Sequence, residues 1–396
     1  MEKLHFDSIC VHDLNETLTT KPHQLPIYAT SSFDFVNLEQ GEEIFTGRQN
    51  GHVYGRYGNP TIDAVANKIA ALETYGSELE GLGLMTSSGM SAISTLMMGL
   101  LQSGDSILAQ GNLYGGTTEL FIKILMPLGI GVKLMDLNDL DLVETTLKSD
   151  ATIKMIYFET PSNPTLDCID IENMVSLAKK YHKITCADNT FATPYLQQPL
   201  ILGVDYVIHS TTKYLNGHGN SITGAIVGTD PVGMKRVWTA LKLVGTNCNP
   251  FDAWLTYMGM KTLPLRMDKQ CANATALANF LSKSDKVLKV NYLSLDTHRH
   301  HHLACKQMKN FGAMMSFELH GGLEAGRKFM NSLKLCSLAP TLGDVDTLIL
   351  HPATMSHINV AKSIREQNGI TDGLIRVSVG IEAIEDLIQD IERGLS

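Results

Sequence analysis

The chain has 396 residues, 44% of them hydrophobic and only 18% charged, and its formal net charge is −9 at pH 7. This length and composition predict a globular protein with two structural regions, one large and one smaller. The charges are spread without runs, which argues against a nucleic-acid or anionic-membrane partner, and the sequence shows neither a secretion signal nor a membrane span. We therefore expect a cytoplasmic protein.

The first 60 residues are irregular and rich in proline, glycine and aromatic residues, which predicts an extended N-terminal arm rather than a domain. After Pro60, the segment TIDAVANKIAALETY places apolar residues at helical spacing, with Thr61 as the expected N-cap. Short apolar runs then alternate with helical patterns as far as SITGAIVG. Brief β-branched runs separated by helices predict a mostly parallel sheet that is covered by helices on both faces.

The pattern changes after the segment NPFDAWL. A long helical stretch over roughly residues 251–282 is followed by the strand-like segments KVNYLSL, GAMMSFEL and LKLCSL, by a helix from Leu323, and by a final helix in EAIEDLIQDIERGL. Strands with fewer crossovers predict a smaller α+β domain. We therefore expect three parts, namely an arm at 1–60, a large α/β domain at 61–255 and a C-terminal α+β domain at 256–396.

Two groups of residues that suggest metal or disulfide chemistry have simpler interpretations. The seven cysteines are widely spaced and form no CxxC pair, which predicts reduced and mostly buried thiols; Cys186, in an apolar strand, is expected to be a packed thiol. The run HRHHH at 298–302 cannot direct all its imidazoles at one ion from a regular element, so we interpret it as a solvated loop. We expect no metal site.

Three strand ends carry polar residues. In an open α/β sheet, ligands bind beyond the carboxyl ends of the strands. The strand KITCADNTF ends in Asp188, VDYVIHS runs into HSTTKYLNGHGN around Lys213, and LMTSSGMSAI places Ser88, Gly89 and Met90 at a strand-to-helix turn. Taken singly, each has an ordinary explanation: a turn aspartate, a surface lysine and a helix-capping serine.

Taken together, these segments predict a site for pyridoxal 5′-phosphate (PLP). This cofactor needs a lysine to bind its aldehyde, an acid beside its ring nitrogen, and N–H and hydroxyl groups around its phosphate. The chain supplies all three in one parallel-sheet layout: Lys213, Asp188, and a phosphate cup made of Gly89, Met90, Ser210 and Thr212.

Over nearly its whole length the chain also resembles the Cys/Met metabolism (trans-sulfuration) family of PLP-dependent enzymes, which includes methionine γ-lyase, cystathionine γ-lyase and cystathionine γ-synthase. The matching segments occur in the same order: YGRYGNPT, SSGMSAI, NLYGGTTELF, YFETPSNPT, ADNTFATPY, HSTTKYLNGHGN, LGDVDTLILHPATMSH and ITDGLIRVSVGIE. The resemblance implies an aspartate aminotransferase-like fold of PLP-dependent transferases, PLP as the cofactor, an amino-acid substrate, and a homotetramer built from dimers with shared active sites.

The resemblance also implies catalytic and cofactor-binding roles. Lys213 would hold PLP covalently and carry protons, Asp188 would pair with the ring nitrogen, and Tyr114 would stack over the ring and act on the leaving group. Tyr54 and Arg56 would reach from the arm to the phosphate bound by the neighbouring subunit. The other phosphate-binding residues would be Ser88, Gly89, Met90, Ser210 and Thr212.

Three further residues would bind the substrate. Arg376, in GLIRVSVG, would hold the substrate carboxylate through two parallel hydrogen bonds, which suits the planar guanidinium group. Asn163 would assist at the carboxylate or at the ring oxygen of PLP. Thr341 stands where the family usually has a serine, and its hydroxyl is retained.

The choice of substrate depends on a few positions where the chain departs from its relatives. Cystathionine-cleaving relatives often carry glutamates where this chain has Val53 and Pro340, and apolar residues there favour methionine or a similar short apolar substrate. Against a strict methionine γ-lyase, Gly116 replaces the usual cysteine, and the segment GTNCNPFDAW lacks a Lys-Asp loop typical of those enzymes.

We expect a PLP-dependent carbon–sulfur lyase that catalyses α,γ-elimination on a sulfur amino acid and releases 2-oxobutyrate, ammonia and a thiol. The alternative is γ-replacement, as in cystathionine γ-synthase or O-acylhomoserine sulfhydrylase. A catalytically silent PLP-binding paralogue would have lost Tyr114, Lys213 or Arg376, and all three are present. An aminotransferase of the same broad fold would not explain the arm motif. His218 and His357 lie in matching segments without an assigned role.

Overall fold

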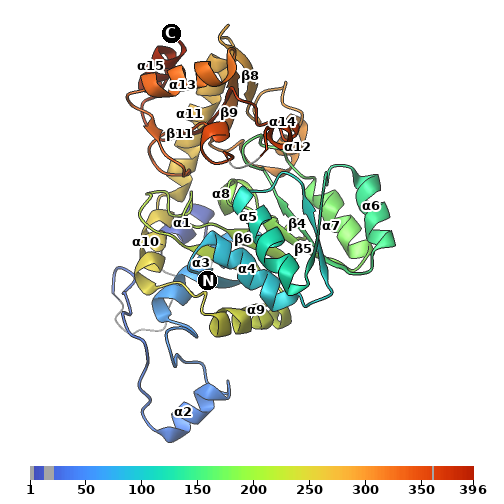
Figure 1. The fold of residues 1–396 in the computed structure, drawn as a ribbon. Helices are drawn as coiled ribbons and strands as arrows, with labels where there is room; N and C mark the ends of the chain where they lie inside the picture. The colour runs from blue at the N-terminus through green and yellow to red at the C-terminus, as the bar shows by residue number, and fades with distance from the viewer. Residues whose placement is uncertain (1–3, 13–21, 359–360) are drawn as a thin grey trace.

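The computed structural model describes residues 4–12, 22–358 and 361–396. They form a large domain around a seven-stranded sheet and a smaller domain around a five-stranded sheet, with an N-terminal segment that extends away from both (Figure 1). This arrangement confirms the expected fold class. The division of the chain at residues 60 and 255 stays a prediction.

The large sheet has the strand order β1-β7-β6-β5-β4-β2-β3. Strand β7 is antiparallel to both of its neighbours, whereas β2, β3, β4, β5 and β6 pair in parallel. The carboxyl ends of β4, β5 and β6 therefore meet at one edge, where an open α/β sheet binds its ligands. The strands are β1 (Leu82–Thr86), β2 (Ser106–Gln110), β3 (Gly131–Met135), β4 (Ile153–Glu159), β5 (Ile184–Asp188), β6 (Tyr206–His209) and β7 (Gly224–Gly228).

Helices cover both faces of this sheet, because its central strands are apolar on both sides. One core lies under helices α4 and α9, and a larger core lies under α3, α6 and α7 and continues into the small domain. The helices up to this point are α1 (Phe6–Val11), α2 (Leu38–Phe45), α3 (Pro60–Glu73), α4 (Gly89–Leu100), α5 (Gly115–Leu120), the π-helix Phe121–Leu125, the 3-10 turn Met126–Leu128, α6 (Leu140–Ser149), α7 (Ile171–Lys180), α8 (Thr193–Leu196) and α9 (Pro231–Val244).

The small domain has the strand order β10-β11-β12-β9-β8, which is antiparallel except for the pair β10–β11. Its strands are β8 (Val287–Asn291), β9 (Met314–Leu319), β10 (Ser337–Leu338), β11 (Leu348–Leu350) and β12 (Leu374–Ser378). Its helices, after α10 (Pro250–Met260), are α11 (Leu263–Leu281), α12 (His301–Gln307), α13 (Gly322–Ser332), the 3-10 turn Pro352–Thr354, α14 (Lys362–Gln367) and α15 (Ile384–Leu395). Residues of α11, α13 and α15 share a core with this sheet.

The predicted N-cap of α3 is wrong. The cap is Asn59, whose side-chain oxygen accepts a hydrogen bond from the Thr61 backbone N–H at 3.0 Å. The Thr61 hydroxyl instead donates to the carbonyl of Pro26 at 2.7 Å. Thr61 therefore ties the N-terminal segment to the large domain, while the preceding asparagine starts the helix.

The helical stretch expected at roughly 251–282 consists of two helices, α10 and α11, with a short break between them. Pro264 lies in the first turn of α11. A proline has no N–H to donate, and its ring would clash with the carbonyl of residue 260 in a continuous helix. The chain therefore ends α10 at Met260 and starts a new helix at Leu263.

The histidine run is not the solvated loop that the sequence suggested. His298 is only 8% exposed and contacts the carbonyl oxygen of Thr165 through Nε2 at 3.2 Å, and His301 begins α12. Arg299 forms an ion pair with Asp167 of the large domain at 2.7 Å, which holds this segment against the domain boundary. Among the described residues, no group of three potential ligands is placed to bind a metal ion.

All seven cysteines are free thiols, and all except Cys305 are buried, as predicted. Cys186 is fully buried in the core under α4 and α9, which confirms it as a packed thiol. Burial raises the pKa of the Cys186 thiol well above its usual range, because the thiolate would be desolvated there. Cys186 is therefore not a reactive group.

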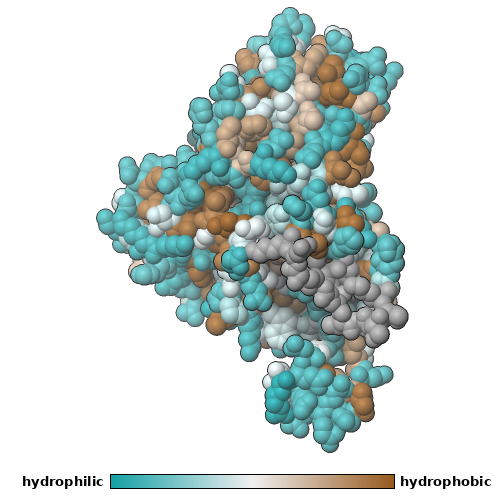
Figure 2. Space-filling view, turned by 180° about the vertical axis from the view of Figure 1, so that it is seen from behind, coloured by the Kyte–Doolittle hydropathy of each residue, from teal (hydrophilic) through white to brown (hydrophobic). Residues whose placement is uncertain are grey.

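The N-terminal segment 22–58 crosses the surface of the large domain and carries α2 away from the body of the molecule (Figures 1 and 2). Val36 and Leu38 in this region are 87% and 84% exposed. The segment is tied down further along by Trp254 and Trp238, whose indole N–H groups donate to the carbonyls of Leu25 and Tyr57. No helix in the described part of the chain is both long and apolar enough to cross a membrane.

Candidate active site

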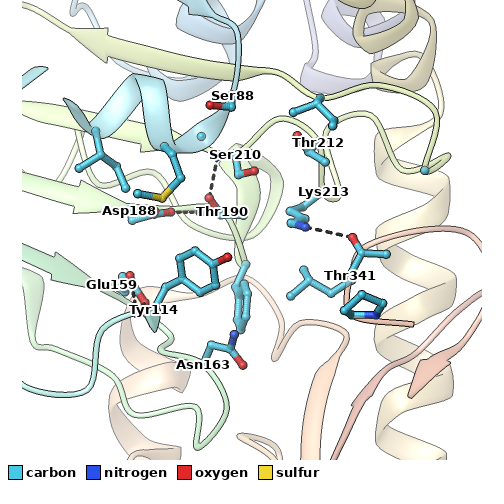
Figure 3. Close-up of a pocket in the computed structure, with 18 of the residues that line it drawn as sticks. Ser88, Tyr114, Glu159, Asn163, Asp188, Thr190, Ser210, Thr212, Lys213 and Thr341 are labelled. Atoms are coloured by element: carbon cyan, nitrogen blue, oxygen red, sulfur yellow. Dashed lines mark hydrogen bonds between the residues drawn. The ribbon is translucent and has the colours of Figure 1, made fainter. Parts of the chain in front are cut away.

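A cavity of about 810 Å³ lies at the carboxyl edge of the large sheet, and the small domain closes one side of it (Figure 3). The ends of β4, β5 and β6 and the start of α4 form its floor. Loop residues Pro340, Thr341 and Leu342 and Arg376 of β12 come from the small domain. The lining includes every predicted site residue except Tyr54 and Arg56: Ser88, Gly89, Met90, Tyr114, Asn163, Asp188, Ser210, Thr212, Lys213, Thr341 and Arg376.

Lys213 follows β6 in a turn, and its side chain extends across the cavity. Its Nζ donates to the Thr341 hydroxyl at 3.0 Å, which links the two domains inside the cavity (Figure 3). Burial lowers the pKa of the Lys213 ammonium, and the positive charge of Arg376 lowers this pKa further. Both effects favour the neutral amine, which is the form that attacks an aldehyde and accepts a proton.

The start of α4 offers unpaired N–H groups to an anion. Ser88 is the N-cap: its hydroxyl accepts from the Ser91 N–H at 3.0 Å, so the N–H groups of Gly89 and Met90 are left pointing out of the helix. A Cβ on Gly89 would lie 2.6 Å from the Cβ of Ser210. Only glycine therefore allows the helix start to approach Ser210 so closely.

The hydroxyls of the lysine turn are not equivalent. Thr212 uses its hydroxyl within the turn, where it donates to the Thr223 carbonyl at 3.1 Å and accepts from the Thr223 N–H at 3.0 Å. The backbone N–H of Ser210 donates to Thr190 Oγ1 at 2.9 Å, which fixes the Ser210 backbone at the cavity floor. In Figure 3 the labelled Ser88, Ser210 and Thr212 lie together at one end of the cavity.

Two carboxyl groups lie side by side on the floor. Asp188 and Glu159 are register partners on the parallel strands β5 and β4. Burial raises the pKa of both groups; the nearby Asp188 charge adds to the effect on Glu159, whose pKa rises to about 8. Thr190 opposes the shift at Asp188, because its N–H donates to Oδ1 at 3.0 Å. Two neighbouring carboxyl groups of this kind favour a positively charged group beside them.

Tyr114 precedes α5, and its ring points into the cavity in Figure 3. Its backbone N–H donates to both carboxylate oxygens of Glu159, at 2.9 and 3.0 Å. A Cβ on Gly116 would lie 2.6 Å from Tyr114 Cε1 and 3.2 Å from the Met90 sulfur. A cysteine at position 116 would therefore require the Tyr114 ring to move. This close contact explains why the chain has glycine at position 116.

The end of the cavity near the small domain carries two buried polar atoms without a partner among the described residues. They are Arg376 Nε and Asn163 Oδ1. Arg376 is only 4% exposed, its Nη2 donates to the Thr341 carbonyl at 2.8 Å, and burial lowers its pKa to about 10. Unpaired buried donors and acceptors are costly, so these atoms are suited to a polar ligand.

These residues fit PLP. An amine with a lowered pKa, an acid pair that favours a cationic ring nitrogen, and a helix start with a close glycine approach are the three parts that the cofactor requires. The unpaired Arg376 and Asn163 atoms leave a separate polar end for a carboxylate. The cavity can therefore hold the cofactor and an amino acid together.

Tyr54 and Arg56 do not reach the cavity of their own chain. Arg56 Nη1 donates to the Lys242 carbonyl, and its guanidinium lies 5.6 and 5.0 Å from the ring centres of Tyr54 and Tyr57. Tyr54 is 41% exposed. Both side chains are thus presented on the outside of the large domain.

The sequence reasoning missed Glu159, Thr190 and Asp252, all of which line the cavity. Glu159 and Thr190 had a usable signal, because each lies at the end of a strand that faces the ligand edge. Asp252 lies in the first turn of α10 and had no such signal.

The two unassigned histidines lie outside the described lining of the cavity. His218 Nδ1 pairs with the Asn216 carbonyl at 2.6 Å, and His357 Nδ1 pairs with the Ser356 hydroxyl at 2.9 Å.

Comparisons with known proteins agree with this geometry. The family described as Cys/Met metabolism PLP-dependent enzyme matches residues 7–396. L-methionine gamma-lyase from Fusobacterium nucleatum subsp. polymorphum is 46% identical over 374 residues, which cover 94% of this chain and 93% of that protein. Cystathionine beta-lyase from Lactococcus lactis subsp. cremoris is 42% identical over 377 residues, 95% of each protein.

A solved structure of similar fold carries the cofactor on a lysine. It is a putative O-acetylhomoserine (thiol)-lyase from Campylobacter jejuni with N'-pyridoxyl-lysine-5'-monophosphate. The TM-score is 0.93 at 31% identity, and the match covers 99% of this chain and 100% of that one.

Proposed function

The chain belongs to the Cys/Met metabolism family of PLP-dependent enzymes, and from that premise we propose that it is a carbon–sulfur lyase that cleaves L-methionine or a similarly short, apolar sulfur amino acid. The reaction is α,γ-elimination: methionine and water give 2-oxobutyrate, ammonia and methanethiol. Several of the relatives with 40–46% identity are named L-methionine gamma-lyases, which supports elimination over replacement.

The apolar residues in the cavity lining are the observation that carries the proposal. Pro340 and Leu342 of the small domain and Ile222 of the large domain are apolar residues in the cavity lining. Beside these side chains a methyl thioether loses no hydrogen bonds, whereas a distal ammonium group would lose its hydration and gain no carboxylate partner from them. This supports a short side chain with an apolar end.

Bound PLP supplies an electron sink that acidifies the α-carbon proton of the amino acid. Asp188 keeps the ring nitrogen protonated, and the α4 start with Ser210 orients the phosphate. The Thr212 hydroxyl holds the lysine turn through Thr223. Arg376 and Asn163 hold the substrate carboxylate, because both residues line the cavity and each has a buried polar atom without a partner among the described residues. Lys213 then accepts the α-carbon proton and returns it elsewhere on the substrate, since its lowered pKa favours the neutral amine.

Tyr114 serves the leaving group. Its ring projects into the cavity between the carboxyl pair and the Lys213–Thr341 contact, so its hydroxyl can reach a substrate held by Arg376 (Figure 3). A phenol at this place donates a proton to the departing sulfur, which leaves as a neutral thiol.

The test is product release from L-methionine by the PLP-loaded protein. We expect 2-oxobutyrate and methanethiol in equal amounts, and slower turnover of L-cystathionine measured alongside. If methionine is inert while cystathionine is cleaved, the proposed substrate is wrong although the elimination chemistry stands.

Asp252 favours a second candidate, cleavage of the longer substrate cystathionine. Its carboxyl lies at the cavity wall, in the first turn of α10, and is held by the side chain of Asn249. A carboxylate there can meet a distal ammonium group. If this candidate is right, Asp252→Asn raises the KM for cystathionine by about tenfold and leaves methionine unaffected.

The replacement alternative has its own readout. A γ-replacement enzyme given an O-acylhomoserine and sulfide forms homocysteine, whereas a lyase forms 2-oxobutyrate from the same mixture. The ratio of the two products assigns the reaction.

We extend the proposal to a homotetramer built from dimers with shared sites. Tyr54 and Arg56 lie outside their own cavity, and the segment around α2 extends from the body with exposed Val36 and Leu38 (Figure 1). Such features suit a contact with a second copy, where Arg56 would complete the phosphate site of the partner. A cytoplasmic location stays a prediction from the sequence.

The shared-site proposal is tested by mixing Arg56→Ala with Lys213→Ala. Each variant alone is expected to be nearly inactive, but a mixed dimer has one intact site. After free subunit exchange, activity should return to about one quarter of the wild-type value, because half of the dimers are mixed and each has one of two sites. No recovery after proven exchange would contradict shared sites.

A further inference from the structure

Glu159 makes an unusual set of contacts for a residue with no assigned role. Both of its carboxylate oxygens accept from a single donor, the backbone N–H of Tyr114, at 2.9 and 3.0 Å. Thr117 Oγ1, in the first turn of α5, lies 3.5 Å from Oε1. Helix α5 has no side-chain cap of its own, so Glu159 of β4 caps it from 45 residues away in the sequence.

The backbone of Glu159 is held by the same loop that it caps. Its N–H donates to Gln110 Oε1 at 3.0 Å, and Gln110 Nε2 donates to Asn112 Oδ1 at 2.6 Å. Asn112 in turn donates to Asp167 at 2.9 Å, which Arg299 of the small domain holds by an ion pair. The loop before Tyr114 is therefore fixed at both ends.

Glu159 is also a wall of the cavity rather than an ordinary cap. It is 6% exposed, it lines the cavity, and it stands in register with Asp188. Figure 3 shows the dashed contact from Glu159 to Tyr114 beside the tyrosine ring that enters the cavity. A shift of the Tyr114 backbone would move that ring.

We propose that Glu159 is a positioning residue: its carboxyl group fixes the Tyr114 backbone and thereby places the phenol over the reacting part of the substrate. This inference rests on the proposed role of Tyr114 in the elimination reaction. Glu159 itself touches neither the leaving group nor the substrate carboxylate in this arrangement; it acts through the tyrosine.

The charged surroundings of Glu159 give the contact a pH dependence. Asp188 faces it from β5, Tyr157 from β4 and Tyr114 from the loop before α5, while Lys213 and Arg376 line the opposite side of the cavity. Burial and Asp188 raise the pKa of Glu159 to about 8. As pH rises through 8 the neutral acid becomes a carboxylate, which accepts the Tyr114 N–H more strongly.

The first experiment reads the Tyr114 amide in the cofactor-free protein, so it does not depend on activity. Hydrogen exchange of the 110–120 segment is measured by mass spectrometry and corrected for the intrinsic pH effect. In the wild type, local openings that break the Tyr114–Glu159 bond while Glu159 stays buried should become about fivefold rarer as pH rises through 8, because a charged acceptor strengthens the bond, although global stability falls over the same range. In Glu159→Gln this step should be absent, and exchange should be faster throughout.

The matched control is Asp390→Asn. Asp390 is another buried carboxyl, which accepts the backbone N–H groups of Lys334, Leu335 and Cys336 in the small domain. This variant should loosen its own segment and leave the 110–120 segment unchanged. Unchanged exchange in Glu159→Gln, with no pH step in the wild type, would overturn the proposal even if the enzyme were inactive on every substrate tried.

The second experiment is a double-mutant cycle with Tyr114→Phe on methionine turnover. Glu159→Gln should lower kcat by about tenfold with little change in KM, and it should cost less than about twofold when Tyr114→Phe is already present. Losses that multiply, together with a shifted visible absorption of bound PLP, would mean that Glu159 acts on the cofactor through Asp188, and would overturn the proposal.

The two experiments distinguish the positioning role of Glu159 from the proposed lyase reaction. If exchange at 110–120 responds as expected but methionine and cystathionine are both inert, the structural role of Glu159 stands and the proposed reaction fails. If turnover is efficient but exchange is insensitive to Glu159, the reaction stands and the positioning role fails.

Discussion

The two ends of the cavity are built in different ways. The cofactor end comes from one domain, where Gly89, Asp188 and Lys213 each lie at or just after the end of a strand of one sheet. The substrate end combines Asn163 of the large domain with Thr341 and Arg376 of the small domain, joined through the Lys213–Thr341 contact. In the proposed assignment, one sheet positions the groups that bind the cofactor, whereas the position of the substrate-binding groups depends on how the two domains meet.

This difference suggests an ordering of mutational effects. Changes at the cofactor end should abolish the reaction for every substrate, and changes at the substrate end should alter KM and the choice of substrate.

Lys213→Ala should lower kcat for methionine by at least about 10³-fold, because the covalent attachment of PLP and the proton transfer are lost together. Release of 2-oxobutyrate measures the loss, and borohydride reduction followed by mass spectrometry shows whether PLP is still attached. Lys306→Ala, at an exposed lysine of α12, is the control and should retain full activity. Substantial residual turnover would show that the cofactor end of the cavity is not essential for the reaction.

Arg376→Lys should raise the KM for methionine by about 10–100-fold and change kcat much less. A lysine keeps the positive charge but cannot form two parallel hydrogen bonds to a carboxylate. Steady-state kinetics separate the two constants. Arg365→Lys is the control, because Arg365 is equally buried in the small domain but pairs with Asp372 away from the cavity. A fall in kcat alone would assign Arg376 to the chemical step instead.

Gly89→Ala should weaken PLP binding by about tenfold, since the new Cβ would lie 2.6 Å from the Ser210 Cβ and push the α4 start away from the phosphate. Titration of the cofactor-free protein with PLP, followed by visible absorption, measures the affinity. At the control position Gly111, an added Cβ meets nothing nearer than 3.6 Å, so Gly111→Ala should bind PLP normally. Equal effects at both positions would argue against a phosphate cup at α4.

The smallest expected effect concerns the carboxyl pair. The pKa of Glu159 is raised from 4.5 to about 8, so the folded protein binds a proton that the unfolded chain has released between these pH values. The free energy of unfolding of the cofactor-free protein should therefore fall as pH rises from about 4.5 to about 8, by about 1 kcal/mol or more from this group.

Glu159→Gln should flatten that slope, because the amide does not titrate. Denaturant unfolding of the cofactor-free wild type and variant at pH 5.5 and 8.5 gives the difference. Asp390→Asn supplies the contrast: backbone N–H groups help hold the pKa of Asp390 low, so its stabilising effect is lost only at acid pH. A wild-type slope that Glu159→Gln leaves unchanged would place the pH dependence elsewhere.

Most residues of the proposed cofactor end, which the structure brings together in one cavity, were identified from the sequence. Asp188 and Lys213 were found because each follows a short apolar strand, and Gly89 because it follows a capping serine at a helix start. The same local reasoning failed where tertiary contacts decide the outcome. Asn59 caps α3 although Thr61 was the predicted cap, since Thr61 is held by the Pro26 carbonyl of the N-terminal segment.

The histidine run shows the same limit. The sequence of the histidine run suggested a solvated loop. In the structure, Arg299 forms an ion pair with Asp167 of the large domain, and His298 is buried where the two domains meet. The strand-end position of Glu159 was a usable signal, but its contact with Tyr114 was not predictable, because Tyr114 lies 45 positions earlier, on a loop that only the order of the parallel strands brings beside it.

The sequence by itself determined the fold class, the family and the residues that suit PLP, because strand ends, helix starts and their polar residues are set by local patterns. Only the tertiary structure decided that Glu159 holds Tyr114, that Lys213 meets Thr341 from 128 positions away, and that Tyr54 and Arg56 point out of their own cavity. The physical reason is that these contacts depend on strand order and domain closure, which bring together side chains that no local pattern relates.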